Sequence, residues 1–250
     1  MRESVALARR LGVRLHTHIA ETSDEEAFCL ERFGCRPVEL LDRMGFLGDD
    51  VWLAHAVHLS APDITRLAAT HTAVAHCPTS NMRLGSGTAL VRELVDAGVP
   101  VGLGVDGSAS NDGAHLLGEV RQAMLVARGR GGPAAMTARE ALWLGTRGGA
   151  ACLGRDDVGS LEPGKRADIA LFDVTGIATA GIEADPVAGI VLAWPQPVHH
   201  LVVEGRFVVR DGALANVPEA DVAGRAHRVA RQIVEGHRAT GTAAPAAGGL

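Results

Sequence analysis

Two histidines and a glutamate lie close together near the start of the chain, in the stretch Leu15-His16-Thr17-His18-Ile19-Ala20-Glu21-Thr22. Imidazole nitrogens bind divalent metals and titrate near neutral pH, and a carboxylate can bind metal or carry a proton. These residue types therefore suit a metal with a proton-transfer partner. The alternative is a hydrogen-bonded core histidine beside a solvated glutamate, and the octet alone leaves both interpretations open.

A strand must position these side chains. Apolar residues alternate with polar ones from Val13 to His18, which predicts a strand with both histidines on one face. Ser23 and Glu26 fit a capping box that opens a helix, so Glu21 falls in the turn between strand and helix. In α/β proteins this edge of the sheet commonly carries the chemistry, because neighbouring strand ends converge there.

The unit of strand followed by helix repeats along the first half of the chain. Further strands are predicted over 51–54, 72–75 and 99–105, with helices over 3–11, 25–44 (interrupted at Pro37), 62–69 and 89–97. The residues that directly follow the three strands are His55, His76 and Asp106. This alternation predicts a parallel sheet, and chemistry collected at one edge favours a barrel.

Four of these residues form one candidate site: His18, Glu21, His55 and Asp106. Neutral histidine and ionised aspartate are ordinary ligands for a divalent metal that keeps a position open for water. Such an ion supplies hydroxide at pH 7, while Asp106 could take the water's proton and Glu21 could carry it to a leaving nitrogen. Each residue alone has an ordinary structural explanation, but four at successive strand ends favour a site.

Two further motifs are weaker. Residues 102–107 match Gly-x-Gly-x-x-Gly after a strand, which could bind a dinucleotide, although Asp106 would place negative charge beside the pyrophosphate. Cys77 could be a nucleophile, but Pro78 follows it and no orienting partner is evident, so a buried thiol is the better interpretation. We expect residues 76–81 to form a loop in which Ser80 and Asn81 hydrogen-bond the backbone or a substrate.

Composition excludes several classes of protein. The 250 residues carry a net charge of −5 and a single lysine, Lys165, and no basic run exceeds Arg9-Arg10, so nothing favours nucleic-acid binding. Four cysteines without Cys-x-x-Cys pairing suggest reduced thiols. The N-terminus lacks a signal-peptide pattern and no apolar run could span a membrane, so we expect a soluble, cytoplasmic protein.

The pattern changes near Gly154. A strand is predicted over 169–172 and a hairpin over 201–209 with its turn at Glu204-Gly205, which are antiparallel elements. We expect a terminal helix over 219–234 and a disordered tail over 239–250.

Several stretches together resemble the amidohydrolase superfamily, in its branch of nucleobase and cyclic-amidine deaminases. The matching motifs are His18-Ile19-Ala20-Glu21-Thr22, Ala54-His55-Ala56-Val57-His58-Leu59, His76-Cys77-Pro78-Thr79-Ser80-Asn81, residues 103–111 and residues 159–168. Within that branch the chain looks most similar to the 8-oxoguanine deaminase subgroup, from residues 52–55, 111–113 and 185–188. The guanine, adenosylhomocysteine and triazine subgroups remain alternatives.

The resemblance implies a role for each site residue. By it, His18 is a metal ligand, Glu21 the proton shuttle, His55 a group that polarises the attacked centre, and Asp106 both ligand and base. It implies one Zn²⁺ or Fe²⁺ per site in the complete enzyme, which is expected to be a homo-oligomer. It further implies a small nucleobase-like substrate, contacted by Asn81 and His58, and loss of an amine to give urate and ammonia from 8-oxoguanine.

One departure limits this expectation. The family takes two metal ligands from a His-x-His on its first barrel strand, whereas Glu21 marks the His16-Thr17-His18 motif as the fifth-strand one. We therefore expect the C-terminal half of a (β/α)8 barrel, about four βα units, followed by part of a small β-sandwich domain. The expected division is 1–153 half barrel, 154–215 β-sandwich part, 216–238 helix and 239–250 tail.

Such a half barrel should be inactive alone, because two ligands are too few for a tight catalytic zinc site. Its unpaired first strand should aggregate or require an N-terminal partner. Two other functions stay open: a non-catalytic half-barrel module that assembles with a partner, and a nucleotide-binding α/β domain.

Overall fold

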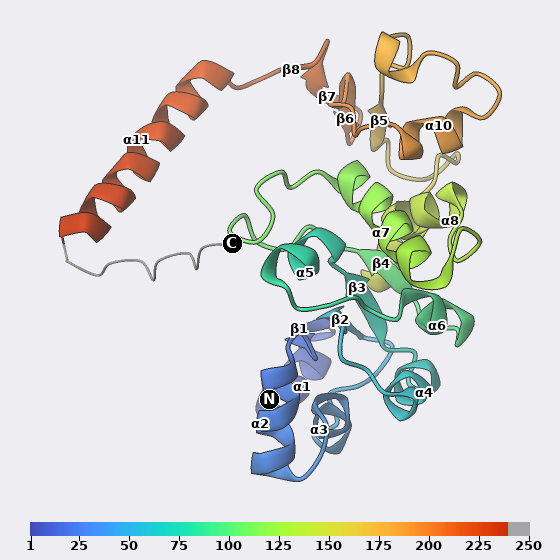
Figure 1. The fold of residues 1–250 in the computed structure, drawn as a ribbon, viewed down its shortest axis with the longest axis vertical. Coiled ribbons are helices and arrows are strands. Elements are labelled where there is room, and N and C mark those ends of the chain that lie inside the picture. The colour runs from blue at the N-terminus through green and yellow to red at the C-terminus, as the bar shows by residue number, and fades with distance from the viewer. Residues whose placement is uncertain (240–250) are drawn as a thin grey trace. The chain divides into compact units, whose positions relative to one another are not determined.

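The computed structural model describes residues 1–239, in which helices alternate with strands through the first half of the chain (Figure 1). The elements in chain order are α1 (Arg2–Leu11), β1 (Leu15–Ile19), α2 (Ser23–Phe33), α3 (Pro37–Arg43), β2 (Val51–His55), α4 (Ala61–Ala69), β3 (Ala73–His76), α5 (Pro78–Leu84), α6 (Val91–Asp96), β4 (Val101–Leu103), α7 (Leu116–Gly131), α8 (Ala138–Trp143), η1 (Leu144–Gly148), α9 (Gly149–Cys152), β5 (Ile169–Leu171), η2 (Ile177–Thr179), α10 (Pro186–Leu192), β6 (His200–Val203), β7 (Arg206–Arg210), β8 (Ala213–Leu214) and α11 (Glu219–Ala239).

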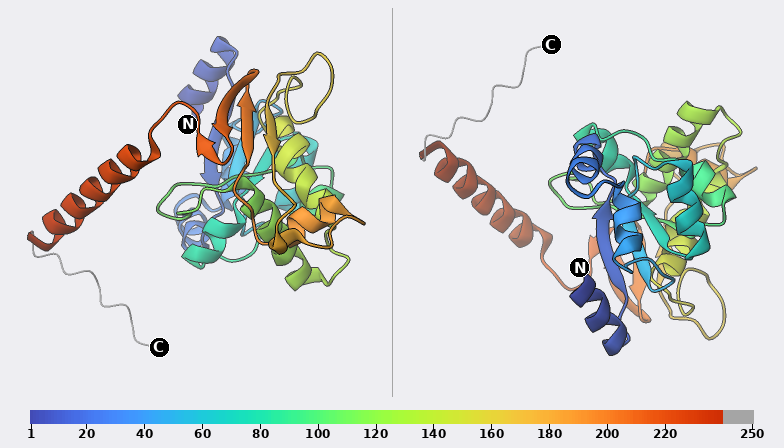
Figure 2. Two further views of the ribbon diagram at one scale, coloured as in Figure 1. Left: turned by 90° about the horizontal axis from the view of Figure 1, so that it is seen from above. Right: turned by 90° about the horizontal axis from the view of Figure 1, so that it is seen from below.

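Strands β1 to β4 form one sheet in the order β1-β2-β3-β4, and all three pairings are parallel. The views in Figure 2 show these strands, coloured blue to green, side by side. Because each crossover runs through helices, the carboxyl ends of all four strands lie at the same edge. The predicted parallel α/β sheet is confirmed, and it is consistent with part of a (β/α)8 barrel.

The core lies on the faces of the central strands. Val51, Leu53 and Val74 are 0% exposed, as expected for side chains on a sheet face that helices cover. Fully buried leucines and methionines from the surrounding helices complete this layer: Leu41, Leu67, Leu94 and Met124. Full burial of one leucine side chain stabilises the fold by roughly 2 kcal/mol, so these contacts hold the edge of the sheet in place.

Local sequence signals set most helix ends. Gly12 ends α1 in the left-handed conformation, and Thr137 with Glu140 forms a capping box at α8. The capping prediction at α2 is wrong by one residue: the N-cap is Thr22, whose side chain accepts a hydrogen bond from the Glu25 N–H. The predicted loop over residues 76–81 is also wrong, because α5 begins at Pro78, which suits the first turn of a helix.

The outer edge of β1 has no partner strand within the described residues. Hydrophobic side chains next to this strand and on its flanking helices are exposed, Leu11 by 63%, Val13 by 52% and Phe28 by 59%. An apolar edge strand of this kind is a template for association with another chain or segment. The expected unpaired apolar edge is therefore present.

The described chain forms two compact units, the first comprising residues 1–166 and 173–196, the second residues 167–172 and those from 197 onward. The second unit holds the antiparallel sheet β5-β6-β7-β8 and the helix α11. Its hairpin turns at Glu204 and Gly205, both with positive φ, which confirms the predicted hairpin. The division at residue 153 and the β-sandwich remain predictions, and the predicted tail falls almost entirely outside the described residues. Within the described part, no helix is both long and apolar enough to cross a membrane.

Candidate metal centre at the carboxyl end of the sheet

The alternation of β1 places its two histidines together. Leu15 and Ile19 are buried, whereas His16 and His18 point to the opposite, open face. The His16 ring stacks on Trp52 with 4.9 Å between centroids, and its Nδ1 lies 3.0 Å from the Trp52 carbonyl oxygen. These contacts give His16 a packing role, while His18 is left free to face the strand ends.

Three donor groups meet at the ends of β1 and β2. His18 Nδ1 lies 3.2 Å from His55 Nε2, and His55 Nε2 lies 3.7 Å from Glu21 Oε2. The ligand atoms of these three residues all lie within 4.8 Å of one another. Two imidazole nitrogens and a carboxylate oxygen are a donor set that suits Zn²⁺ or Fe²⁺ with positions left open for water and substrate. The residues present therefore fit a divalent metal.

The His55 ring is completely buried, and the nitrogen that faces away from His18 and Glu21 is held by Asn81. Its Nδ1 lies 2.9 Å from the amide oxygen of Asn81, which can only accept a hydrogen bond. With the amide in that orientation, the ring carries its proton on Nδ1 and turns the Nε2 lone pair toward His18 and Glu21. A hydrogen bond to the far nitrogen of this kind fixes both tautomer and ring orientation in metal sites.

Asp106 lies near this cluster but is not one of the three residues in it. Its Oδ2 accepts hydrogen bonds from the hydroxyls of Ser80 at 2.5 Å and Ser110 at 2.8 Å. Burial works against ionisation, but these two hydrogen bonds outweigh it and hold the pKa of Asp106 at about 2. Asp106 is therefore a fixed negative charge at neutral pH.

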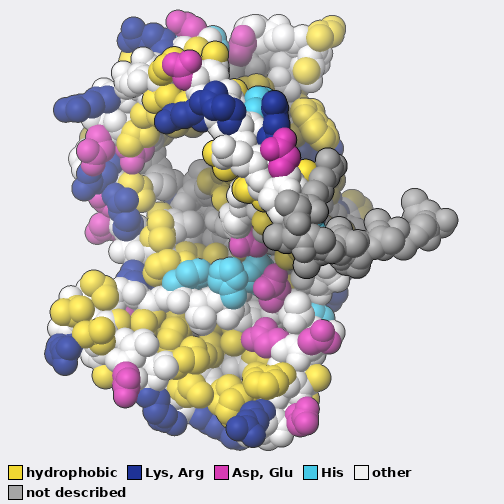
Figure 3. Space-filling model, turned by 90° about the vertical axis from the view of Figure 1, so that its left-hand side faces the viewer, with side chains coloured by type: hydrophobic (Ala, Val, Ile, Leu, Met, Phe, Trp, Pro, Cys, Tyr) yellow, Lys and Arg dark blue, Asp and Glu magenta, His cyan; other side chains and the backbone are white. Residues whose placement is uncertain are grey.

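A pocket of about 410 Å³ joins Asp106 to the histidine face of β1. Its lining includes His16, His18, Trp52, Cys77 and Asp106. This volume is in the range of roughly 300–1,000 Å³ that small-molecule sites occupy. On the face drawn in Figure 3, histidine and acidic side chains gather next to a broad area of hydrophobic side chains.

The two predicted substrate-binding residues have other contacts. Asn81 is 1% exposed and holds His55 through its amide oxygen. His58 Nε2 lies 2.9 Å from the Ser86 carbonyl oxygen. Neither side chain lines the pocket that contains Asp106 and His18, so their role as substrate contacts remains a prediction.

The weaker motifs have structural explanations. Burial raises the pKa of the Cys77 thiol to about 12, which leaves it protonated and a poor nucleophile. The glycine-rich stretch after β4 does not open into a helix, because α7 begins only at Leu116. A Cβ at Gly102 would lie 2.8 Å from the Gly149 Cα, so this glycine is required for close packing of α9 on the sheet.

Backbone strain is concentrated at the same edge. Four of the eight non-glycine residues with positive φ in the described chain are at strand ends around the cluster: Ala20, His55, Ala56 and Asp106. Left-handed backbone costs a non-glycine residue about 1–2 kcal/mol, and such residues are common at functional sites. The surrounding contacts therefore hold these loops in a conformation that the chain alone would not favour.

Some contacts of the site were not predicted. Ser80, expected to hydrogen-bond the backbone or a substrate, holds Asp106 together with Ser110. The buried carboxylate of Glu119 accepts from the Asn111 amide at 2.8 Å and the Thr79 N–H at 3.1 Å. The one signal for Glu119 is an acidic residue between the buried Leu117 and Val120 on α7. Its partners come from α5 and the loop after β4, which no local pattern reveals.

The fold and the donor cluster define an α/β protein with a candidate metal centre at the carboxyl ends of its parallel strands. Residues 1–208 match the amidohydrolase family. The chain is 46% identical over 236 residues to the 8-oxoguanine deaminase of Pseudomonas aeruginosa, and 39% identical over 239 residues to hydroxydechloroatrazine ethylaminohydrolase of Pseudomonas sp. (strain ADP). Each comparison covers 94% of this chain, and 52% and 49% of the relative.

Solved structures of related hydrolases share this fold. The chain superposes on a zinc-bound adenosine deaminase from Xanthomonas campestris with a TM-score of 0.89 and 29% identity, covering 94% of this chain and 54% of that one. It superposes on atrazine chlorohydrolase from Arthrobacter aurescens TC1, complexed with zinc, with a TM-score of 0.83 and 36% identity, covering 88% and 49%. The chain belongs to the amidohydrolase family, and it spans about half the length of the curated relatives it matches.

Proposed function

We propose that this chain forms the C-terminal half of a metal-dependent hydrolytic deaminase that acts on a purine-like cyclic amidine, with 8-oxoguanine as the substrate. The observation that carries the proposal is the meeting of His18, Glu21 and His55 within 4.8 Å at the strand ends. The 46% identity to an 8-oxoguanine deaminase supports the choice of substrate. Relatives that act on other substrates keep adenosylhomocysteine-type and triazine-type activity as alternatives.

His18 would hold the metal, with Glu21 and His55 beside it, and Zn²⁺ is the ion favoured by the two zinc-bound structural neighbours. When bound, a divalent cation lowers the pKa of a water toward 7 and so supplies hydroxide at neutral pH. Asp106 adds a fixed negative charge to the pocket that His18 lines, and it would be a further ligand.

The remaining chemistry falls to the side chains of this chain. Water adds to the ring carbon that bears the exocyclic amine, the C–N bond breaks, and the products are the ring carbonyl and ammonia. Glu21 would receive the water's proton and deliver it to the leaving nitrogen, because a carboxylate at this edge can reach both. His55, held by Asn81, would accept a hydrogen bond through Nε2 from an O–H of the water that adds to the ring, and so would orient it.

The complete site would require elements beyond these 250 residues. The outer edge of β1 lacks a partner strand in the described chain, and the three clustered donors are fewer than a closed metal site uses. We propose that a further βα segment completes the barrel and the metal site, and that β5 to β8 form part of a composite β-sandwich. We also propose a cytoplasmic location and a homo-oligomeric complete enzyme.

A complementation assay tests this function. The purified chain is incubated with Zn²⁺ or Fe²⁺ and 8-oxoguanine, alone and together with the N-terminal half of the Pseudomonas aeruginosa relative, and ammonia and urate are measured. We expect turnover only in the mixture, and greater turnover of 8-oxoguanine than of guanine, adenosylhomocysteine or a triazine. Turnover by the chain alone would contradict the need for a second segment. A chain that folds without metal and forms a complex without turnover of any of these compounds would support a non-catalytic module.

A further inference from the structure

The loop that carries His55 leaves its strand in an unfavourable conformation. His55 has φ of 71° and Ala56 has φ of 49°, while Ala20, at the end of the neighbouring strand, also has φ of 49°. Two consecutive left-handed residues that are not glycine need external contacts to persist. Whatever fixes this loop also fixes the position of His55 relative to Glu21.

Backbone hydrogen bonds supply part of that restraint. The Ala56 N–H donates to the Ile19 carbonyl at 3.1 Å, and the N–H groups of Val57 and His58 donate to the Ala20 carbonyl at 3.0 and 2.9 Å. These bonds join the loop after β2 to the end of β1. None of these three bonds involves the carbonyl oxygen of His58, which accepts from a side chain instead.

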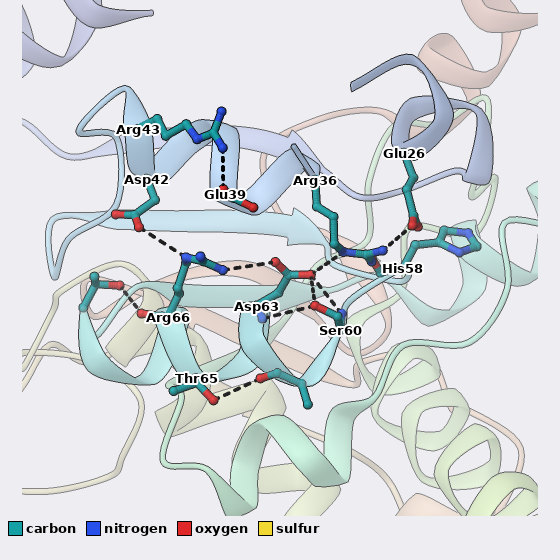
Figure 4. A network of polar contacts seen from close by, with 12 residues as sticks. Glu26, Arg36, Glu39, Asp42, Arg43, His58, Ser60, Asp63, Thr65 and Arg66 are labelled. Carbon is teal, nitrogen blue, oxygen red and sulfur yellow. Dashed lines mark hydrogen bonds and ion pairs between the residues drawn. The ribbon is translucent and has the colours of Figure 1, made fainter. Parts of the chain in front are cut away.

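Arg36 provides that partner. Its Nη2 donates to the His58 carbonyl oxygen at 2.9 Å, its Nε donates to Asp63 Oδ2 at 2.9 Å, and its Nη1 donates to Glu26. Figure 4 shows this guanidinium between the three acceptors, which come from α2, from the loop after β2 and from α4. One planar fork therefore joins the helix that follows Glu21 to the loop that contains His55.

The surroundings of Arg36 favour a rigid contact. The side chain of Asp63 is 2% exposed, and its Oδ2 also accepts from the Ser60 N–H and hydroxyl in the capping box of α4. Charge-assisted hydrogen bonds to a buried carboxylate are stronger than exposed ion pairs. A lysine could not reach three separately placed acceptors, because it carries a single ammonium group on a flexible stem.

We propose that Arg36 is a positioning residue that holds the loop from His55 to His58 against α2 and α4, and so fixes the separation of His55 from Glu21. The contacts of Arg36 alone carry its role in holding the loop. That this role matters for catalysis rests on the proposed function. A purely structural ion pair would instead contribute only to global stability.

The chain offers a matched control in Arg66. This arginine also pairs with Asp63, at 3.9 Å, and with Asp42, at 3.3 Å, and its side chain is 33% exposed compared with 27% for Arg36. It has no hydrogen bond to the loop after β2. Arg36→Lys and Arg66→Lys are thus the same chemical change on either side of one carboxylate.

Hydrogen exchange of single amides in the 250-residue chain separates the two roles. We expect Arg36→Lys to speed exchange of the Ala56, Val57 and His58 amides by about 10-fold to 100-fold, as for loss of one charge-assisted hydrogen bond. Amides that hydrogen-bond β3 to β4 and its following residue should keep their wild-type rates, such as that of Gly104, which donates to the His76 carbonyl. All amides in Arg66→Lys should keep them too. Equal acceleration everywhere, unchanged loop amides, or loop amides already unprotected in the wild type would each overturn the proposal.

Kinetics of the complemented enzyme test the catalytic meaning separately. Arg36→Lys should lower kcat by about 10-fold or more with KM nearly unchanged, because a misplaced His55 affects the reacting geometry more than binding. Arg66→Lys should leave both constants unchanged. If no preparation turns over a purine, the proposed function fails while hydrogen exchange still decides the positioning role. Local loosening of the loop without loss of kcat would contradict the catalytic part.

Discussion

His76 should make the fold sensitive to mild acid. It ends β3 and is not among the residues that line the pocket, unlike its neighbours Ala75 and Cys77. It is 1% exposed, and neither ring nitrogen has a hydrogen-bond partner among the described residues. Burial, with a smaller contribution from the charge of His55, lowers the pKa of His76 to about 3. In the unfolded chain the same imidazole has its ordinary pKa of about 6.5.

The sign and size of the effect follow from these two values. Between pH 6.5 and pH 3 the unfolded chain binds one more proton than the folded chain, so the free energy of unfolding falls as the pH falls through this range. Each pH unit contributes about 1.4 kcal/mol, and the loss from pH 7.5 to pH 5.0 amounts to about 2 kcal/mol. That is a large share of the 5–15 kcal/mol by which domains are typically stable.

Urea denaturation at both pH values, followed by circular dichroism, measures this loss in the wild type and in His76→Leu. The leucine variant should lose about 2 kcal/mol less between pH 7.5 and pH 5.0, because it carries no group to protonate. At pH 7.5 it should be as stable as the wild type or more so, since leucine has a similar volume and leaves no buried polar atom unsatisfied. His71→Asn removes an exposed imidazole and should keep the wild-type pH dependence.

Parallel pH profiles for the wild type and His76→Leu would refute this reasoning. A loss of several kcal/mol for the variant at pH 7.5 would refute it too, because the ring nitrogens must then have favourable partners in the folded state.

Three further changes test the site and the edge of the sheet. Glu21→Gln should retain metal in the complemented enzyme, measured by elemental analysis, but lower kcat by about 10²-fold to 10⁴-fold if this carboxylate carries the proton; unchanged kcat would contradict that role. Ser80→Ala should raise the pKa of Asp106 from about 2 toward its ordinary value of about 4, measured by NMR titration of the carboxyl carbon, because one of two hydroxyl donors is lost. Leu11→Lys should reduce self-association in sedimentation velocity without lowering thermal stability, since this side chain is 63% exposed beside the open strand; equal association would place the contact elsewhere.

The sequence was sufficient to predict the parallel sheet. Each strand is a short apolar run that lies between helices. Residues close in sequence mark the helix ends, such as the glycine that ends α1 and the capping box at α8. Local signals also predicted the Glu204-Gly205 hairpin, because the turn type depends on two residues. The helix α10 was missed because its N-cap, Asp185, precedes only seven residues, an almost wholly apolar run with a glycine and three β-branched residues, which has neither amphipathic periodicity nor high helix propensity.

The contacts that assemble the site could be predicted only in part. His18, Glu21 and His55 come together because parallel strands bring their carboxyl ends to one edge, which the alternation of elements implies. The partners of these residues lie at long range: Arg36 precedes α3 but acts on the loop after β2, and Asn81 is on a helix expected to be a loop. No pattern in a single sequence encodes such pairings.

The strained residues mark the limit of sequence reasoning most clearly. A positive φ is predicted readily at Gly12, but nothing in the types of Ala20, His55 and Ala56 favours the left-handed region. These residues adopt it because the loops must turn sharply at the strand ends to bring His55 beside Glu21, and because Arg36 and three backbone hydrogen bonds hold them there. Replacing Ala56 with glycine should therefore relieve strain and stabilise the fold slightly, by up to about 1 kcal/mol, while faster exchange of the loop amides would show that the turn has become less rigid. A lower free energy of unfolding for the glycine variant in urea denaturation would mean that alanine is not strained in this turn. The inference that outside contacts hold the turn in place would then be wrong.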